Sequence, residues 1–150
     1  MNHEVVILVA EDDEGHAGLI KKNLIRAGII NELLHFNNGQ DILDFLFKQG
    51  DEPHRRSGVS YILLLDIRMP KVDGTQVLEK VKADPELRKM PVIMITTTND
   101  PREVAHCHEM GCSNYITKPV NYTDFVNAIR QLGLFLSVVE IPKINGTSTE

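Results

Sequence analysis

Acidic, hydroxyl and basic side chains follow apolar runs at four separate places in this 150-residue chain. They are Glu11, Asp12 and Asp13, then Asp66, then Thr96 to Thr98, and last Thr117 and Lys118. Carboxylates that lie close together raise one another's pKa unless a cation lies among them. Oxygen ligands of this kind favour Mg²⁺, which in proteins commonly binds phosphate oxygens as well. These residue types therefore indicate phosphoryl chemistry, provided that the fold brings the four places together.

The apolar runs predict buried strands that alternate with amphipathic helices. The expected strands are Val5–Ala10, Ile30–Phe36, Tyr61–Leu65, Val92–Ile95 and Asn114–Thr117. The expected helices run over about residues 17–27, 42–46, 74–84, 101–110 and 122–136. This alternation predicts a doubly wound α/β fold with a five-stranded parallel sheet and right-handed crossovers. Parallel strands end at the same edge of a sheet, so we expect the four places to meet there.

The acidic residues differ in the chemistry that their positions suit. Asp66 stands alone at the tip of its strand, which suits a nucleophile that accepts a phosphoryl group. Glu11 and Asp12 are paired and are better placed to hold a metal ion. Asp13 is expected to cap the next helix, since an acid there accepts a hydrogen bond from a free backbone N–H. Capping accounts for any one acid, but not for the whole set.

The charge balance of 16 Lys and Arg against 21 Asp and Glu gives a net charge of −5. This negative net charge argues against mainly electrostatic binding to DNA or to an anionic membrane. The amino end shows neither a signal peptide nor a membrane-spanning run, so we expect a cytoplasmic protein. Cys107 and Cys112 are expected to be reduced thiols, and His106 and His108 have no further ligands at metal-binding spacing.

Four motifs, taken in order, resemble the receiver domain of two-component response regulators. They are EDD at residues 11–13, LLLDIRMPKVDG at 63–74, PVIMITT at 91–97 and GCSNYITKP at 111–119. Each motif is a weak signal alone, but all four occur in the order and at the spacing of the family. The match covers about residues 4–136 and implies a CheY-like, flavodoxin-like (βα)5 fold.

The resemblance implies that Asp66 accepts a phosphoryl group from a phosphohistidine on a sensor histidine kinase. Glu11, Asp12 and Asp66 would hold Mg²⁺ together with the backbone carbonyl of Arg68. The protein would then be a phosphoacceptor with self-catalysed phosphotransfer and autodephosphorylation, and not a turnover enzyme. Arg68 departs from the small polar residue common at this position, and its long side chain could shield the water that attacks the phosphoryl group.

The resemblance also assigns roles to residues near the last two strands. Thr96 would hydrogen-bond a phosphoryl oxygen, and Lys118 would form an ion pair with the phosphoryl group. Tyr115 would be an aromatic switch whose ring position follows Thr96 and changes the neighbouring surface. The Lys118–Pro119 peptide would be cis, which is uncommon among X-Pro bonds.

Residues 137–150 extend beyond the resemblance and add apolar side chains that one helix face does not need. We expect Leu134, Phe135, Val138 and Val139 to form a homodimer contact, with extra packing inside the chain as the alternative. The end, INGTSTE, has the composition of a flexible tail. The pattern resembles stand-alone regulators paired with bacterial phytochromes, which implies a phytochrome-type sensor kinase as partner. Residues 137–150 are too few for a DNA-binding domain.

Two other functions share some of these features. A Mg²⁺-dependent phosphatase also forms an aspartyl phosphate, but Arg68 stands where its usual second Asp would act as general acid. A degenerate receiver that only binds other proteins would have no physical reason to keep mutually repelling carboxylates. Turnover of a phosphate ester would favour the phosphatase, and the absence of Mg²⁺ binding would favour the degenerate receiver.

Overall fold

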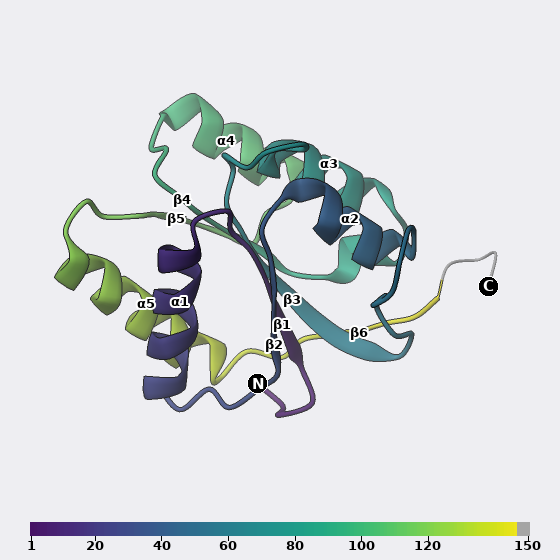
Figure 1. Cartoon of the computed structure of the whole chain (residues 1–150), viewed down its shortest axis with the longest axis horizontal. Helices are drawn as coiled ribbons and strands as arrows, with labels where there is room; N and C mark the ends of the chain where they lie inside the picture. The colour runs from purple at the N-terminus through teal and green to yellow at the C-terminus, as the bar shows by residue number, and fades with distance from the viewer. Residues whose placement is uncertain (147–150) are drawn as a thin grey trace.

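The computed structural model describes residues 1–146. Helices cover both faces of a parallel sheet (Figure 1). The parallel strands are β1 (Val6–Ala10), β2 (Leu33–Phe36), β3 (Val59–Leu65), β4 (Val92–Thr96) and β5 (Asn114–Thr117). The α-helices are α1 (Glu14–Arg26), α2 (Gly39–Phe47), α3 (Gly74–Ala83), α4 (Pro101–Met110) and α5 (Tyr122–Leu136), with a 3-10 turn at Leu87–Lys89. The strand order is β2-β1-β3-β4-β5, so the predicted doubly wound α/β fold is confirmed.

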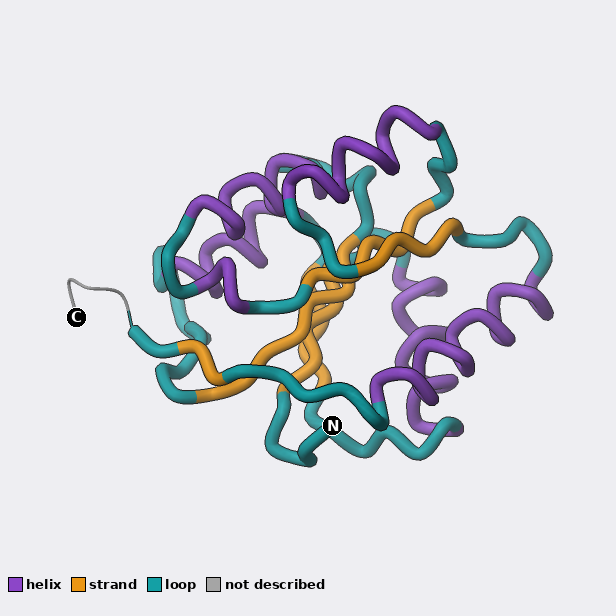
Figure 2. The backbone as a smooth tube through the Cα atoms, turned by 180° about the vertical axis from the view of Figure 1, so that it is seen from behind, coloured by secondary structure: helices purple, strands orange, loops and turns teal. Residues whose placement is uncertain are grey.

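The two faces of the sheet contribute to two separate apolar cores. In β1, Val6, Leu8 and Ala10 face the core beneath α2, α3 and α4. Ile7 and Val9 face the other core, beneath α1 and α5. Figure 2 shows the two helix layers from behind, with the strands between them. Burial on both faces explains why the strands are continuous apolar runs. Among residues 1–146, no helix is long and apolar enough to cross a membrane.

Two aspartates start the helices that follow β1 and β3. Asp13 caps α1, because its carboxylate accepts a hydrogen bond from the His16 N–H at 3.0 Å. Asp73 caps α3 in the same way and receives a reciprocal contact from the side chain of Gln76. Next to Asp73, a Cβ on Gly74 would lie only 2.1 Å from the backbone oxygen of Asp66. The DG turn therefore lets α3 begin directly against the end of β3.

The strand β2 is shorter than predicted. It begins at Leu33, whereas the sequence predicted a start at Ile30. The side chain of Ile30 is largely exposed, so its apolar character does not mark a buried strand.

A short strand near the carboxyl end joins the sheet and was not predicted. This strand, β6 (Lys143–Ile144), runs antiparallel to the start of β3 and pairs Ile144 with Val59. Ile144 is fully buried. The expectation of a flexible tail was therefore wrong at Ile144, and its part at 147–150 lies outside the described residues.

A buried arginine explains why the chain returns to β3. Arg55 lies in the loop expected to be only polar, but its side chain is 3% exposed. Its Nε donates to the Leu46 carbonyl at 2.8 Å, and its Nη1 donates to the Asn145 carbonyl at 3.0 Å. The segment around β6 thus satisfies a buried guanidinium and covers the core with Ile144.

Candidate functional site

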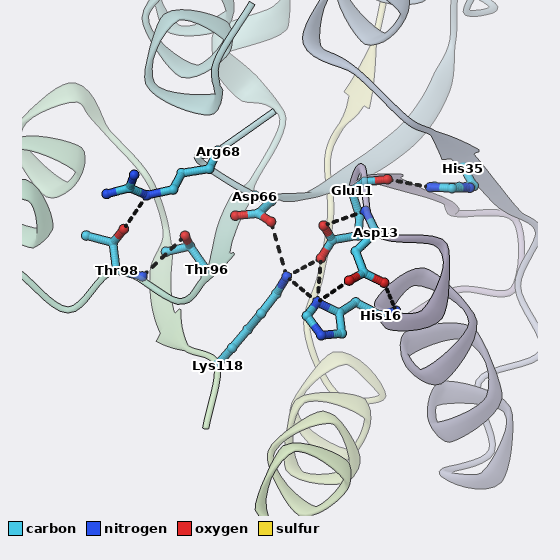
Figure 3. Close-up of polar contacts among 9 residues, drawn as sticks. All are labelled: Glu11, Asp13, His16, His35, Asp66, Arg68, Thr96, Thr98 and Lys118. Carbon is cyan, nitrogen blue, oxygen red and sulfur yellow. Dashed lines mark hydrogen bonds and ion pairs between the residues drawn. The ribbon is translucent and has the colours of Figure 1, made fainter. Parts of the chain in front are cut away.

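The carboxyl ends of four strands bring polar side chains to one edge of the sheet (Figure 3). Glu11 follows β1 and Asp66 follows β3, and the Asp66 N–H donates to the Ala10 carbonyl at 3.0 Å. His35 of β2 donates from Nε2 to the Glu11 carbonyl at 2.7 Å. Lys118 follows β5, next to the end of β4. The parallel topology thus assembles side chains that are far apart in the sequence.

Three carboxylates form a compact cluster at this edge. Glu11, Asp12 and Asp66 each offer one oxygen, and these oxygens all lie within 4.8 Å of one another. Glu11 and Asp66 are buried, whereas Asp12 is exposed. A hard divalent cation prefers several oxygen ligands, often with water, and one exposed carboxylate leaves the cluster open to solvent. The donor set therefore fits Mg²⁺ or Mn²⁺ better than a metal that prefers sulfur or nitrogen.

Lys118 lies beside the carboxylates and is itself buried. Its Nζ donates to Oδ2 of Asp66 at 3.1 Å and also pairs with Oε1 of Glu11. A third contact reaches Nδ1 of His16 at 3.0 Å. Sequence reasoning missed His16, because helical spacing alone does not distinguish a residue that faces the cluster from a surface one. Its place three residues after the capping Asp13 was the one available signal.

The pKa of Glu11 reflects this crowded site. The pKa of Glu11 is raised to about 8, because burial raises it more than the Lys118 ammonium lowers it, and the neighbouring Asp66 adds to the rise. One ammonium between two buried carboxylates leaves an excess of negative charge. A cation at the cluster would relieve this repulsion and favour the charged form of Glu11.

Thr98 links the end of β4 to residues on either side. Its N–H donates to the buried Thr96 hydroxyl at 3.5 Å, and its carbonyl accepts from the Tyr115 hydroxyl at 2.8 Å. The Nε of Arg68 donates to the Thr98 hydroxyl at 3.4 Å (Figure 3). The Arg68 side chain therefore points toward Thr98 and away from the carboxylate cluster.

The peptide before Pro119 differs from the expectation. Lys118–Pro119 is trans, and the cis X-Pro bond found in the described chain is Glu52–Pro53. The expectation of a cis peptide at this position was therefore wrong, and the bond has the trans form that most X-Pro bonds adopt.

The residues predicted for a dimer contact lie at the end of α5 and just beyond it. Leu134, Phe135 and Val138 are exposed, at 64%, 46% and 76%. Val139 differs, because it is half-buried and packs against the core beneath α1 and α5. Packing inside the chain therefore accounts for Val139, and the other three side chains remain on the surface.

The two cysteines have no place in the site. Cys107 and Cys112 are buried free thiols, and burial raises the pKa of Cys107 to about 11. Across residues 1–146, neither His106 nor His108 belongs to a group that could hold a metal ion.

Comparison with known proteins places these features in a family. Residues 7–130 match the family model described as response regulator receiver domain. The response regulator Rcp1 of Synechocystis sp. is 31% identical over 142 residues, which cover 94% of this chain and 95% of Rcp1.

Solved structures agree with this match. A response regulator receiver domain from Rhodospirillum rubrum is 47% identical with a TM-score of 0.87, over 94% of this chain and 99% of that one. The Mn²⁺-bound form of Rcp1 is 30% identical with a TM-score of 0.82, over 91% and 98%. The phosphorylated cyanobacterial phytochrome response regulator RcpA is 26% identical with a TM-score of 0.81, over 91% and 97%. This chain belongs to the response regulator receiver domain family of two-component signalling and is related to phytochrome response regulators.

Proposed function

We propose that the protein is a phosphoacceptor whose Asp66 receives a phosphoryl group from a phosphohistidine of a sensor histidine kinase. The observation that carries the proposal is the position of Asp66. It shares a cluster of carboxylate oxygens within 4.8 Å with Glu11 and Asp12, and the Lys118 ammonium lies 3.1 Å from its Oδ2. A nucleophilic carboxylate, a cation site and a fixed ammonium are the groups that phosphoryl transfer requires.

In the proposed transfer, a carboxylate oxygen of Asp66 attacks phosphorus and the bond from phosphorus to the donor imidazole nitrogen breaks. The products are an acyl phosphate on Asp66 and an imidazole that takes up a proton from water. Glu11, Asp12, Asp66 and the Arg68 backbone carbonyl would hold Mg²⁺, which supplies charge neutralisation at the phosphoryl oxygens. The Mn²⁺-bound structure of Rcp1 supports a divalent cation in this family.

Thr96 and Lys118 complete the environment of the phosphoryl group. The ammonium of Lys118 pairs with one phosphoryl oxygen, and the hydroxyl of Thr96 donates to another. A phosphoryl group adds roughly 1.5 to 2 negative charges at neutral pH, enough to draw both groups toward it.

Tyr115 connects this movement to the protein surface. Its hydroxyl is held by the Thr98 carbonyl, two residues from Thr96. When Thr96 moves toward the phosphoryl group, the backbone at Thr98 follows and changes the position that Tyr115 prefers. The surface formed by α4, β5 and α5 is then the signalling output.

Phosphorylation in solution tests the assignment. The wild-type protein with acetyl phosphate and Mg²⁺ is expected to gain one phosphate by mass spectrometry, and Asp66→Asn is expected to gain none. Asp124→Asn is the matched control, because Asp124 is an exposed acid on α5 outside the cluster. It should be labelled like the wild type. A phosphate that persists on Asp66→Asn contradicts the assignment.

The alternatives have less support in the geometry. A phosphatase would need a general acid two residues after the nucleophile, but Arg68 occupies that position and its guanidinium contacts Thr98. A degenerate receiver would not need the acidic cluster beside Lys118. Both carboxylates of the ion pairs with Lys118 are buried, which is costly unless they act on a ligand.

We also propose that the protein has a phytochrome-type kinase as partner and forms a dimer with a second copy of the chain. Residues 4–136 would be the receiver, and residues 137–150 an extension. The name of RcpA, a phytochrome response regulator, supports the kinase class. The exposed Leu134, Phe135 and Val138 support the dimer.

A further inference from the structure

A histidine that the proposed function leaves without a role contacts the active-site lysine. The Lys118 ammonium has three N–H donors and no acceptor. Within the described part of the chain, these donors meet Oε1 of Glu11, Oδ2 of Asp66 at 3.1 Å and Nδ1 of His16 at 3.0 Å (Figure 3). Two acceptors are carboxylates of the acidic cluster, and His16 is the third.

The start of α1 holds His16 in place for this contact. His16 is the third residue of the helix, after the cap at Asp13. A Glu or Gln at this position commonly turns back to the cap backbone. The His16 ring instead packs against Phe125 of α5, with ring centroids 5.6 Å apart. Because a lysine ammonium can only donate, Nδ1 accepts and the ring proton lies on Nε2.

Phosphoryl transfer changes what the other two acceptors, Glu11 and Asp66, interact with. A cation in the cluster attracts oxygens of Glu11 and Asp66, and a phosphoryl group replaces the carboxylate charge of Asp66. The cluster does not include His16, although its Nδ1 lies 3.7 Å from Oε1 of Glu11. His16 is therefore the acceptor that stays available to Lys118 throughout the reaction.

We propose that His16 is a positioning residue that keeps the Lys118 ammonium directed at the phosphoryl group on Asp66. The contact ties the lysine after β5 to α1, and the packing of the ring on Phe125 limits its movement. This inference rests on the proposed phosphoacceptor function, because Lys118 needs a fixed direction only if it acts on a phosphoryl group.

Two substitutions of His16 separate this role from simple packing. Rates of phosphorylation by acetyl phosphate at saturating Mg²⁺ are measured for the wild type, His16→Ala and His16→Asn, with Mg²⁺ affinity measured by calorimetry. Asn carries its Oδ1 acceptor on Cγ, as His carries Nδ1, but lacks the ring. The expected result is a loss of about tenfold in rate for His16→Ala, the size of one charge-assisted hydrogen bond. His16→Asn is expected to recover most of the rate, with Mg²⁺ affinity unchanged in both.

Other results of these rate measurements would contradict either the role of His16 or the proposed function. Equal rates for His16→Ala and the wild type overturn the role of His16 and leave the phosphoacceptor function intact. Equal losses in both variants, or losses matched by weaker Mg²⁺ binding, show an effect on packing or on the metal site and overturn it as well. A wild type that takes up no phosphate overturns the proposed function, and the role of His16 with it.

Discussion

Glu11 is a buried carboxylate that lies next to a second one, Asp66. It is 2% exposed and shares the Lys118 ammonium with Asp66. A single ammonium cannot neutralise two buried carboxylates, so the folded protein favours a proton on Glu11 when no cation is present. Burial first, and then the negative charge of Asp66, raise the pKa of Glu11 to about 8, and the same excess of negative charge suits the cluster to a divalent ion.

Removing the charge of Glu11 should therefore stabilise the metal-free protein at high pH. Its pKa is raised from 4.5 in the unfolded chain to about 8 in the folded one. Between these two pH values the folded state keeps a proton on Glu11 that the unfolded state loses. The contribution of Glu11 to the free energy of unfolding is therefore fully present below pH 4.5 and is lost as the pH rises to about 8. Glu11→Gln cannot ionise. We expect its free energy of unfolding to exceed that of the wild type by about 4 kcal/mol at pH 8 and to match it near pH 4.5.

Urea denaturation in EDTA at several pH values measures this difference. Other groups titrate over the same range, but they are common to both proteins and cancel in the comparison. Parallel curves of the free energy of unfolding against pH for Glu11→Gln and the wild type would show that folding does not raise the pKa of Glu11.

At the scale of the elements, the sequence predicted most of what places the site. Continuous apolar runs such as Tyr61–Leu65 identified the parallel strands, and the parallel order brings their carboxyl ends together whatever the side chains are. The contact between His16 and Lys118 was not predictable, because periodicity locates a helix face but not the direction of one ring. The strand β6 has two residues, which is too short for any alternating pattern.

The strand β6 should contribute to stability although it lies near the end of the chain. Ile144 is fully buried, and its carbonyl accepts from the Gly58 N–H at 2.7 Å. Ile144→Ala is expected to lower the free energy of unfolding by about 2 kcal/mol, through lost burial and a cavity. Lys143→Ala, in the same strand but exposed, should change it by less than about 0.5 kcal/mol. Chemical denaturation of both variants measures this, and equal effects would show that β6 does not dock in solution.

At the scale of the whole molecule, the carboxylate cluster and the proposed dimer contact lie toward different ends of α5. Lys118 lies beside the cluster and leads into the start of α5, and the exposed apolar side chains lie where α5 ends. The carboxyl end of α5 is also close to the amino terminus, because the terminal amine of Met1 donates to the Ser137 carbonyl. A second copy could therefore bind at that end without covering the carboxylate cluster.

The dimer contact is tested by placing charge on this apolar surface. Phe135 and Val138 are 46% and 76% exposed and lie three residues apart, on one side of the helix end. Asp at both positions should leave the fold intact, because neither side chain is in a core, and should abolish an apolar interface. Light scattering is expected to show a dimer for the wild type and a single 16.9 kDa chain for Phe135→Asp/Val138→Asp. Val120→Asp is the control, since Val120 is fully exposed in the loop before α5, and it should remain dimeric. A double variant that keeps the dimer mass would place the interface elsewhere, because two buried, unpaired carboxylates at a dimer contact could not be tolerated.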